Sequence, residues 1–239
     1  MNSRLSLLVI GLIACTAPAA NAQVDALSVA TDKVRDLTAQ LRVVESEMNS
    51  DALQELGGAF ATSYRIPRYD VWYKFPGKAR FEGKAGILSG TLIYNGNKKK
   101  YQVGFIKKTK DVTGKPGEKQ GLMDLGVFSR DWLADYSPSF VKKDGANVVF
   151  KLTQRNSTSD SYEVVTVDPK THITVKRLSY GGDGKLRKEL RYQTPRSVGP
   201  GIWVPTRVEL FAPSGKKAGA QVIESLVVNK GVEESRFSL

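Results

Sequence analysis

Few residues of this 239-residue sequence are able to do acid–base, nucleophilic or metal chemistry. The sequence contains one His and one Cys, which excludes a disulfide framework, an iron–sulfur cluster and the usual Cys/His zinc sites. His172 stands beside a turn, and the only acid near it in sequence is Asp168. A catalytic base needs an orienting partner, so we interpret His172 as a solvated loop residue.

Three acidic residues follow one another at Asp124, Asp131 and Asp135. Carboxylates with this spacing on amphipathic helices are more typical of a solvated face than of a metal site. The sequence has no EF-hand, HExxH, GxSxG or P-loop motif, and the glycine-rich segment 181–184 is interpreted as a turn. We therefore expect no enzyme activity, no metal site and no cofactor.

Residues 1–22 are typical of an export signal. Arg4 ends a short basic region, residues 5–14 are apolar, and residues 20–22 provide a small-x-small cleavage site. The apolar run of about ten residues is too short for the roughly twenty that span a bilayer. The sequence predicts a signal peptide over 1–22, a periplasmic protein and one domain over 23–239.

A second interpretation of the amino terminus involves Cys15. The run from Leu12 to Cys15 resembles a bacterial lipobox, in which the Cys receives a diacylglyceryl group. Cleavage before Cys15 would give a lipid-anchored protein, and cleavage after Ala22 would give a soluble one. Pro18 and the small residues before the second site favour the soluble form.

The chain is basic, with 36 Lys+Arg, 24 Asp+Glu and a formal charge of +12. Outside the cytoplasm, such a charge suits anionic lipid head groups, anionic glycans or acidic partners, and export argues against nucleic acid. A simpler interpretation is solubility, because the basic residues are scattered and only Lys98 to Lys100 form a run.

Helical periodicity is confined to three stretches, and the rest of the chain alternates like strands. We expect a helix over 23–36, a helix beginning near Ser50, and a helix over 120–134 that is split at Gly126 and Ser129. Asn95-Gly96 is a strong hairpin signal, and residues 107–119 are expected to be a polar loop. Strands are expected near residues 38–47, 69–75, 79–82, 91–94, 100–106, 148–152, 162–164, 173–175, 186–192, 204–210 and 222–228.

This pattern predicts an α+β, mainly β fold. The short spacing between turns favours an antiparallel meander of about nine to eleven strands. Such a wide sheet must curl, close or be covered, and the helices are expected to cover the concave side of a strongly curved sheet. The apolar interior of such a sheet can be larger than its own side chains fill.

Seven large apolar residues are candidates for the lining of that interior. They either fill a core or line a cavity for acyl chains, in which each buried CH₂ contributes about 0.8 kcal/mol. Lys98 to Lys100 at the mouth would meet an anionic head group. The seven candidates are Trp72, Phe75, Leu92, Tyr94, Tyr101, Phe105 and Phe150.

Several short phrases of the sequence occur in a familiar order. They are Tyr73–Glu82, Leu92–Gly96, Val167–Thr171, Ile202–Arg207 and Val228–Val232. In this order the chain from about residue 24 to 239 resembles the LolA-like superfamily, especially its outer-membrane lipoprotein-sorting branch. The resemblance implies an unclosed β-barrel with helices as a lid over an apolar cavity, and an arginine that holds the lid, for which Arg42 and Arg65 are candidates by position.

The expected function follows from the resemblance and from the missing catalytic groups. We expect a monomeric, non-enzymatic binding protein for acyl chains, which carries lipoproteins or lipids across the periplasm and touches membranes transiently or through a lipid anchor. The alternative is an envelope sensor or scaffold that binds another cell-envelope protein, as the stress-sensing branch of the superfamily does.

Overall fold

Residues 23–239, apart from the side chains of Ala59 and Leu88, are described by a computed structural model. The expected signal peptide and Cys15 lie outside the described residues. Within this part of the chain the strands are β1 (Asp36–Val43), β2 (Arg68–Lys74), β3 (Lys78–Ala85), β4 (Leu88–Asn95), β5 (Lys98–Val103), β6 (Ile106–Asp111), β7 (Tyr136–Asp144), β8 (Asn147–Gln154), β9 (Tyr162–Asp168), β10 (Ile173–Tyr180), β11 (Leu186–Gly199), β12 (Ile202–Phe211) and β13 (Lys217–Val228).

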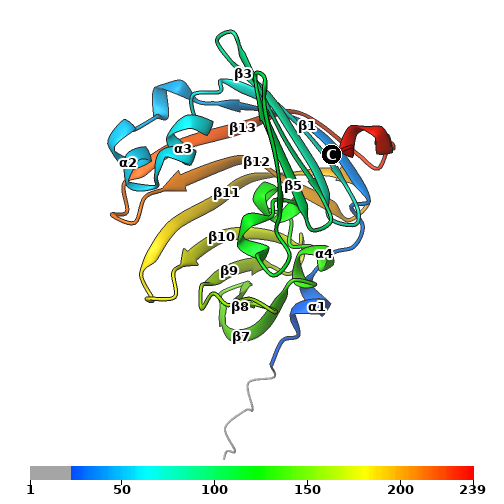
Figure 1. Cartoon of the computed structure of the whole chain (residues 1–239). Helices are drawn as coiled ribbons and strands as arrows, with labels where there is room; N and C mark the ends of the chain where they lie inside the picture. Colours follow the sequence, from blue (N-terminus) through cyan, green and yellow to red (C-terminus); the bar gives the residue numbers. More distant parts are fainter. Residues whose placement is uncertain (1–22) are drawn as a thin grey trace, which may run out of the picture.

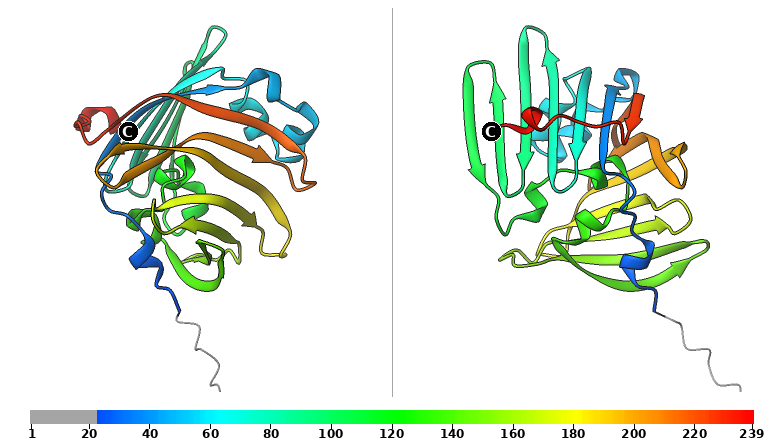
Figure 2. Two further views of the ribbon diagram at one scale, coloured as in Figure 1. Left: turned by 180° about the vertical axis from the view of Figure 1, so that it is seen from behind. Right: turned by 90° about the vertical axis from the view of Figure 1, so that its right-hand side faces the viewer.

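The strands form one sheet in the order β6-β5-β4-β3-β2-β1-β13-β12-β11-β10-β9-β8-β7. All of these pairings are antiparallel. The sheet bends around an interior, and its edge strands β6 and β7 do not pair with each other (Figures 1 and 2). The expected curved, unclosed antiparallel sheet is confirmed, but residues 23–239 form thirteen strands and the expected nine to eleven were too few.

The two strands that the sequence did not predict are the two edges of the sheet. β6 occupies the first part of the segment 107–119 that was expected to be a loop, and no strand was expected where β7 lies. All six residues of β6 are exposed. A strand with both faces in water has no apolar alternation from which to predict it.

Helices are short in the described part of the chain. They are α1 (Ala26–Val29), α2 (Ser50–Glu55), α3 (Gly58–Ser63), α4 (Arg130–Leu133) and the 3-10 helices η1 (Glu45–Glu47), η2 (Pro116–Glu118), η3 (Leu122–Leu125) and η4 (Glu234–Phe237). The helix expected over 23–36 is wrong beyond Val29. The backbone of Thr31 donates to Phe128 O (2.9 Å) and accepts from Arg130 N (3.0 Å), so tertiary pairing replaces the helical hydrogen bonds.

The chain between the two edge strands crosses the concave side of the sheet. This segment, residues 112–135, carries η2, η3 and α4. It lies between the part of the sheet that contains β2–β6 and the part that contains β7–β10 (Figure 2). The expected split of a helix over 120–134 is confirmed, because η3 ends at Gly126, which has a φ of 81°. Phe128, Trp132 and Leu133 pack against the inner face of β8 and β9 and form a filled core there.

The outer face of β2–β4 is covered by the end of the chain. Phe237 of η4 is buried and packs with Val232, Ile93 and Trp72. Lys74 Nζ donates to Val232 O at 2.8 Å, which holds the same segment to β2. This part of the sheet therefore buries apolar residues on both of its faces.

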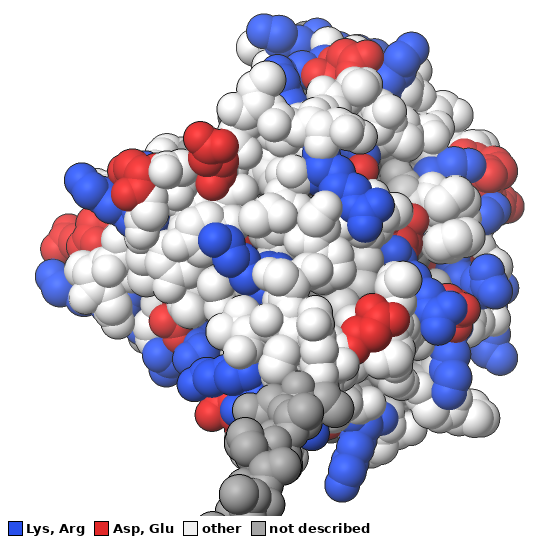
Figure 3. All heavy atoms as spheres, turned by 90° about the horizontal axis from the view of Figure 1, so that it is seen from below, with Lys and Arg blue, Asp and Glu red and all other residues white. Residues whose placement is uncertain are grey.

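Charged side chains are dispersed over the face of the molecule shown in Figure 3, where Lys and Arg are interspersed with Asp, Glu and uncharged residues. Several basic residues are already paired, such as Lys78 with Glu234 (2.7 Å) and Lys110 with Glu118 (2.8 Å). On that face, dispersed charge favours solubility over a single anion-binding patch.

Candidate ligand cavity

A cavity of about 380 Å³ lies on the concave side of the sheet. It is lined by residues of β1–β5, β11, β12 and β13, and by α3 and η3, and it is partly open to solvent. Its apolar lining includes Leu41, Phe60, Phe81, Leu92, Tyr101, Leu125, Leu190, Val208 and Leu210. The volume lies near the lower end of the roughly 300–1,000 Å³ that is usual for ligand pockets.

Strand alternation and register place this lining on one face. Leu41 of β1 pairs with Tyr69 of β2 and with Ile223 of β13. Farther along the sheet, Leu92 of β4 pairs with Phe81 of β3 and with Tyr101 of β5. Because successive residues of a strand point to opposite faces, each of these rows presents its side chains to the interior.

α3 forms one wall of the cavity and follows the capped helix α2. Asn49 caps the preceding helix α2 by accepting a hydrogen bond from Ala52 N (3.1 Å), and Gly57, with a φ of 96°, lets the chain turn into α3. The buried Tyr64 ring then packs on Gly219 of β13, where a Cβ would lie 2.5 Å from the ring. This anchoring places Phe60 of α3 against the cavity.

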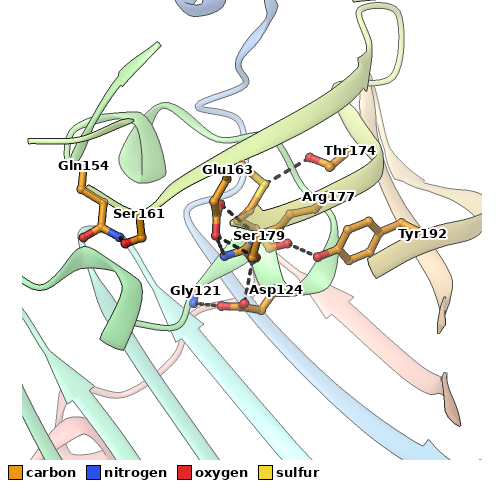
Figure 4. Close-up of polar contacts among 10 residues, drawn as sticks. Gly121, Asp124, Gln154, Ser161, Glu163, Thr174, Arg177, Ser179 and Tyr192 are labelled. Carbon is orange, nitrogen blue, oxygen red and sulfur yellow. Dashed lines mark hydrogen bonds and ion pairs between the residues drawn. The ribbon is translucent and has the colours of Figure 1, made fainter. Parts of the chain in front are cut away.

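A buried ion cluster borders the cavity through Asp124 and ties the segment 112–135 to the sheet (Figure 4). The guanidinium of Arg177 on β10 donates to both carboxylate oxygens of Glu163 on β9, at 2.9 and 2.6 Å. It also donates to Asp124 of η3 at 2.9 Å, and Asp124 accepts from Gly121 N at 2.8 Å. Burial alone would lower the pKa of Arg177, but Glu163 and Asp124 outweigh it and hold the pKa well above its ordinary value.

Two more polar groups line the cavity. Tyr69 Oη donates to Gln221 Oε1 at 2.6 Å and thereby bridges β2 and β13. Lys188 of β11 points to the same interior, and its Nζ lies 5.1 Å from the centre of the Phe60 ring. The cavity is therefore apolar along most of its wall, with charged groups from β11, η3 and β3.

The seven residues predicted for the lining fall into four environments. Leu92 and Tyr101 line the cavity. Tyr94 is buried on the same face but borders a separate space of about 250 Å³, next to Tyr73 and Trp132. Phe150 lies in the filled core under β8.

The other three predicted residues lie away from the interior. Trp72 is on the outer face of β2, against the C-terminal segment, and Arg236 lies 4.5 Å from its ring. Phe75 is 40% exposed after the end of β2, and Phe105 is fully exposed between β5 and β6. Of the lysine run, Lys99 points inward over the ring of Tyr94 (5.5 Å), and Lys98 and Lys100 alternate to the outer face.

Several lining residues were not proposed from the sequence. Phe60, Phe81, Leu190 and Leu210 occur in segments correctly expected to be helix or strand. Their periodicity indicated which residues share a face. Which face is concave depends on how the whole sheet bends, and local sequence patterns do not predict that bend. No sequence signal had indicated Lys188 or Arg177.

The residues that were considered for catalysis or metal binding lie apart from one another in the structure. His172 Nδ1 lies 2.7 Å from Val29 O, in a turn that Asp168 stabilises by accepting from Lys170 N at 2.9 Å. Asp131 accepts from Tyr73 Oη (2.8 Å) and Asp135 from Lys119 Nζ (2.7 Å), so these two do not converge with Asp124. Within residues 23–239, no group of three or more His, Cys, Asp or Glu side chains is arranged to hold a metal ion.

No protein-family model matches the sequence, and no curated protein matches it. Solved structures do match. A LolA superfamily protein of Nitrosomonas europaea superposes with a TM-score of 0.57 and 14% identity, over 90% of this chain and 94% of that chain. A domain of Vibrio parahaemolyticus, described as an outer membrane lipoprotein-sorting protein, superposes with a TM-score of 0.55 and 13% identity, over 84% of this chain and 88% of that chain. This chain has the LolA-superfamily fold.

Neither of the two arginines that were candidates for holding a lid faces the cavity. The resemblance implied a lid arginine, with Arg42 and Arg65 as candidates. Arg42 lies on the outer face, where it pairs with Glu224 (2.5 Å), and Arg65 is exposed after α3. Within residues 23–239, Arg177 joins the segment 112–135 to the sheet through Asp124.

Proposed function

We propose that this chain is a periplasmic, non-enzymatic binding protein for acyl chains. In this proposal residues 1–22 are a signal peptide that is removed after Ala22, and residues 23–239 act as one monomeric domain. The single observation that carries the proposal is the apolar cavity of about 380 Å³ behind α3 on the concave face. The fold supports it, because one structural neighbour is described as a lipoprotein-sorting protein.

The cavity offers enough apolar wall to bind a chain without other chemistry. Each CH₂ removed from water contributes about 0.8 kcal/mol, so ten buried CH₂ groups contribute about 8 kcal/mol. Association itself costs an estimated 4–15 kcal/mol, so ten CH₂ groups alone leave at most about 4 kcal/mol, which corresponds to a Kd of about 1 mM or weaker. Such an affinity suits a protein that both takes up and releases its ligand.

Gly90 provides a direct test of this proposal. It lies on the inner face of β4 with no heavy atom within 4 Å of where a Cβ would be, so a side chain has room to begin there and Gly90→Phe should project its ring into the cavity. We expect it to weaken binding of a fluorescent fatty acid at least tenfold. Ser89→Phe is the matched control, because the exposed Ser89 is on the opposite face of the same strand.

Native mass spectrometry of the purified protein gives the second measurement. Co-purified lipid in the wild type and its loss in Gly90→Phe would support the proposal. Equal probe affinity in Gly90→Phe, Ser89→Phe and the wild type would overturn it. Absence of both lipid and probe binding would favour the alternative, an envelope sensor or scaffold that binds another protein.

We also propose that two hairpin tips beside the cavity make the transient contact with membranes. Ile87 between β3 and β4 and Phe105 between β5 and β6 are 101% and 105% exposed, and Ile106 is 70% exposed. β4 pairs with β5, so the two tips lie side by side (Figure 2). Val103, which lines the cavity, stands two residues before Phe105.

The charges near these tips fit an anionic bilayer surface. Lys84 precedes one tip, and Lys107 and Lys108 follow the other, all of them exposed. Each basic residue close to an anionic surface contributes about 1 kcal/mol, and each inserted apolar side chain about 1.5–3 kcal/mol. Contact through the tips would bring the cavity close to the bilayer, so that an acyl chain is able to move between the bilayer and the cavity.

Vesicle co-sedimentation tests the contact. We expect the wild type to bind phosphatidylglycerol vesicles more strongly than phosphatidylcholine vesicles, and the Ile87→Ser/Phe105→Ser variant to lose most of this binding. Val141→Ser/Val227→Ser is the control, since these residues are 51% and 48% exposed elsewhere on the sheet. Equal loss in both variants, or no binding by the wild type, would contradict a role for the tips.

A further inference from the structure

Lys188 is a basic side chain on the wall of a mainly apolar cavity, whose lining also includes the acids Asp124 and Glu82. It lies on the inner face of β11, two residues before Leu190, and both residues line the cavity. Its ammonium rests near the ring of Phe60, at 5.1 Å from the ring centre. Among residues 23–239, no hydrogen bond or ion pair is made by this ammonium.

The acids nearest in the fold are already engaged. Glu163 and Asp124 are both bonded to Arg177, at 2.6–2.9 Å. Burial lowers the pKa of Lys188, and the like charge of Arg177 lowers it further, while Asp124 and Glu163 act in the opposite direction without touching it. The side chain is half-buried, and a charge that is partly removed from water without a direct partner costs free energy, which a bound counter-charge recovers.

We propose that Lys188 binds the anionic head of a single-chain amphiphile inside the cavity. The head is a carboxylate or a phosphate, and its chain lies along the wall formed by Leu190, Leu210 and Leu92. This inference rests on the proposed acyl-chain binding and names its ligand class. A cavity of about 380 Å³ is near the lower end of the range for ligand pockets, which suits one chain.

The geometry also explains why a lysine serves at this position. An ammonium on a flexible stem presents three donors to any oxygen that reaches it, and the Phe60 ring stabilises the free cation through its π face. A charge-assisted hydrogen bond is about twice as strong as a neutral one. Ligands with identical chains should therefore differ in affinity according to their head groups.

Matched ligands separate this inference from the proposed function. Dodecanoic acid, dodecyl phosphate and dodecanol share one chain and differ in the head, and each displaces a neutral fluorescent acyl probe if it binds. We expect the wild type to bind at least one of the two anions about tenfold more tightly than dodecanol. The preferred anion shows whether a carboxylate or a phosphate is recognised.

Substitution of Lys188 gives the decisive measurement. Lys188→Met keeps the length and loses the charge, so it should abolish the preference and leave dodecanol affinity within about twofold of the wild type. Lys188→Arg should retain the preference. Lys176→Met, at an exposed position on the neighbouring β10, is the control and should behave like the wild type.

Each remaining outcome has one meaning. If all three ligands displace the probe equally from the wild type, or if Lys188→Met keeps the anion preference, the role of Lys188 is wrong while acyl-chain binding stands. If no ligand displaces the probe and the probe itself does not bind, the proposed function is wrong and this inference fails with it. Circular dichroism of the variants establishes that the fold is kept.

Discussion

Removal of the guanidinium at Arg177 should destabilise the protein more than any change to a surface ion pair. The side chain is 4% exposed and its partner Glu163 is 9% exposed. The Arg177→Leu variant leaves the carboxylates of Glu163 and Asp124 without their partner in the interior. Removing one partner of a buried pair costs about 3–5 kcal/mol, a large part of the roughly 5–15 kcal/mol that stabilises a typical domain.

Urea unfolding, followed by circular dichroism, measures this loss. With a slope of about 3 kcal/mol/M, the midpoint should fall by at least about 1 M. Arg187→Leu on β11 is the matched control, because the Arg187–Asp183 pair is 57% and 43% exposed. Exposed pairs contribute about 0–1 kcal/mol, so this control should unfold within about 0.3 M of the wild type.

A second substitution tests whether the cost comes from the uncompensated charge. The double variant Arg177→Leu/Glu163→Leu removes the carboxylate that makes two of the three contacts of Arg177 with carboxylates. It should be at least about 1 kcal/mol more stable than the sum of the two single variants predicts, because coupled residues are not additive. A loss for Arg177→Leu no larger than for Arg187→Leu, or strict additivity of the double variant, would refute the reasoning.

Two further predictions concern the C-terminal segment and acid stability. Phe237→Ala should cost about 3–5 kcal/mol, since Phe237 is 1% exposed, whereas Leu239→Ala, at 41% exposure, should cost under about 0.5 kcal/mol in the same urea assay. Hydrogen bonds from Arg207 and Lys217 lower the pKa of Glu47 from 4.5 to about 2. Because this pKa is lower in the folded state, the stabilisation is complete above about pH 4.5 and is lost as the pH falls toward 2. The partial exposure limits it to about 1 kcal/mol, and thermal melts of Glu47→Gln should lack this part of the acid dependence; an unchanged acid profile would contradict the assignment.

Local signals predicted the strands that are buried on one face or both. Asn95-Gly96 indicated a hairpin, and Gly96 has a φ of 57° in the turn between β4 and β5. The alternation of Leu41 and Val43 indicated β1, whose odd-numbered residues are buried. These predictions succeeded because alternate burial imposes a period of two on the sequence.

The edges of the sheet and the lining of the cavity needed information that is not local. β6 is rich in lysine and exposed along its whole length, as expected for an edge that must resist pairing with other chains. Trp72 and Leu92 both belong to alternating strands, but Trp72 faces the C-terminal segment and Leu92 faces the cavity. Because η4 buries the outer face of the same strands, apolar character alone did not identify the inner face.

The interior is both a filled core and a lined cavity, and the boundary between the two has a physical cause. On the β8 side of the Arg177 cluster, Phe128, Trp132 and Phe150 fill the space between the segment 112–135 and β8. On the β4 side, Gly90 occupies an inner-face position and leaves the space in front of it open. A large side chain there would extend the core across the sheet, so the cavity exists where the sequence supplies no side chain to fill it.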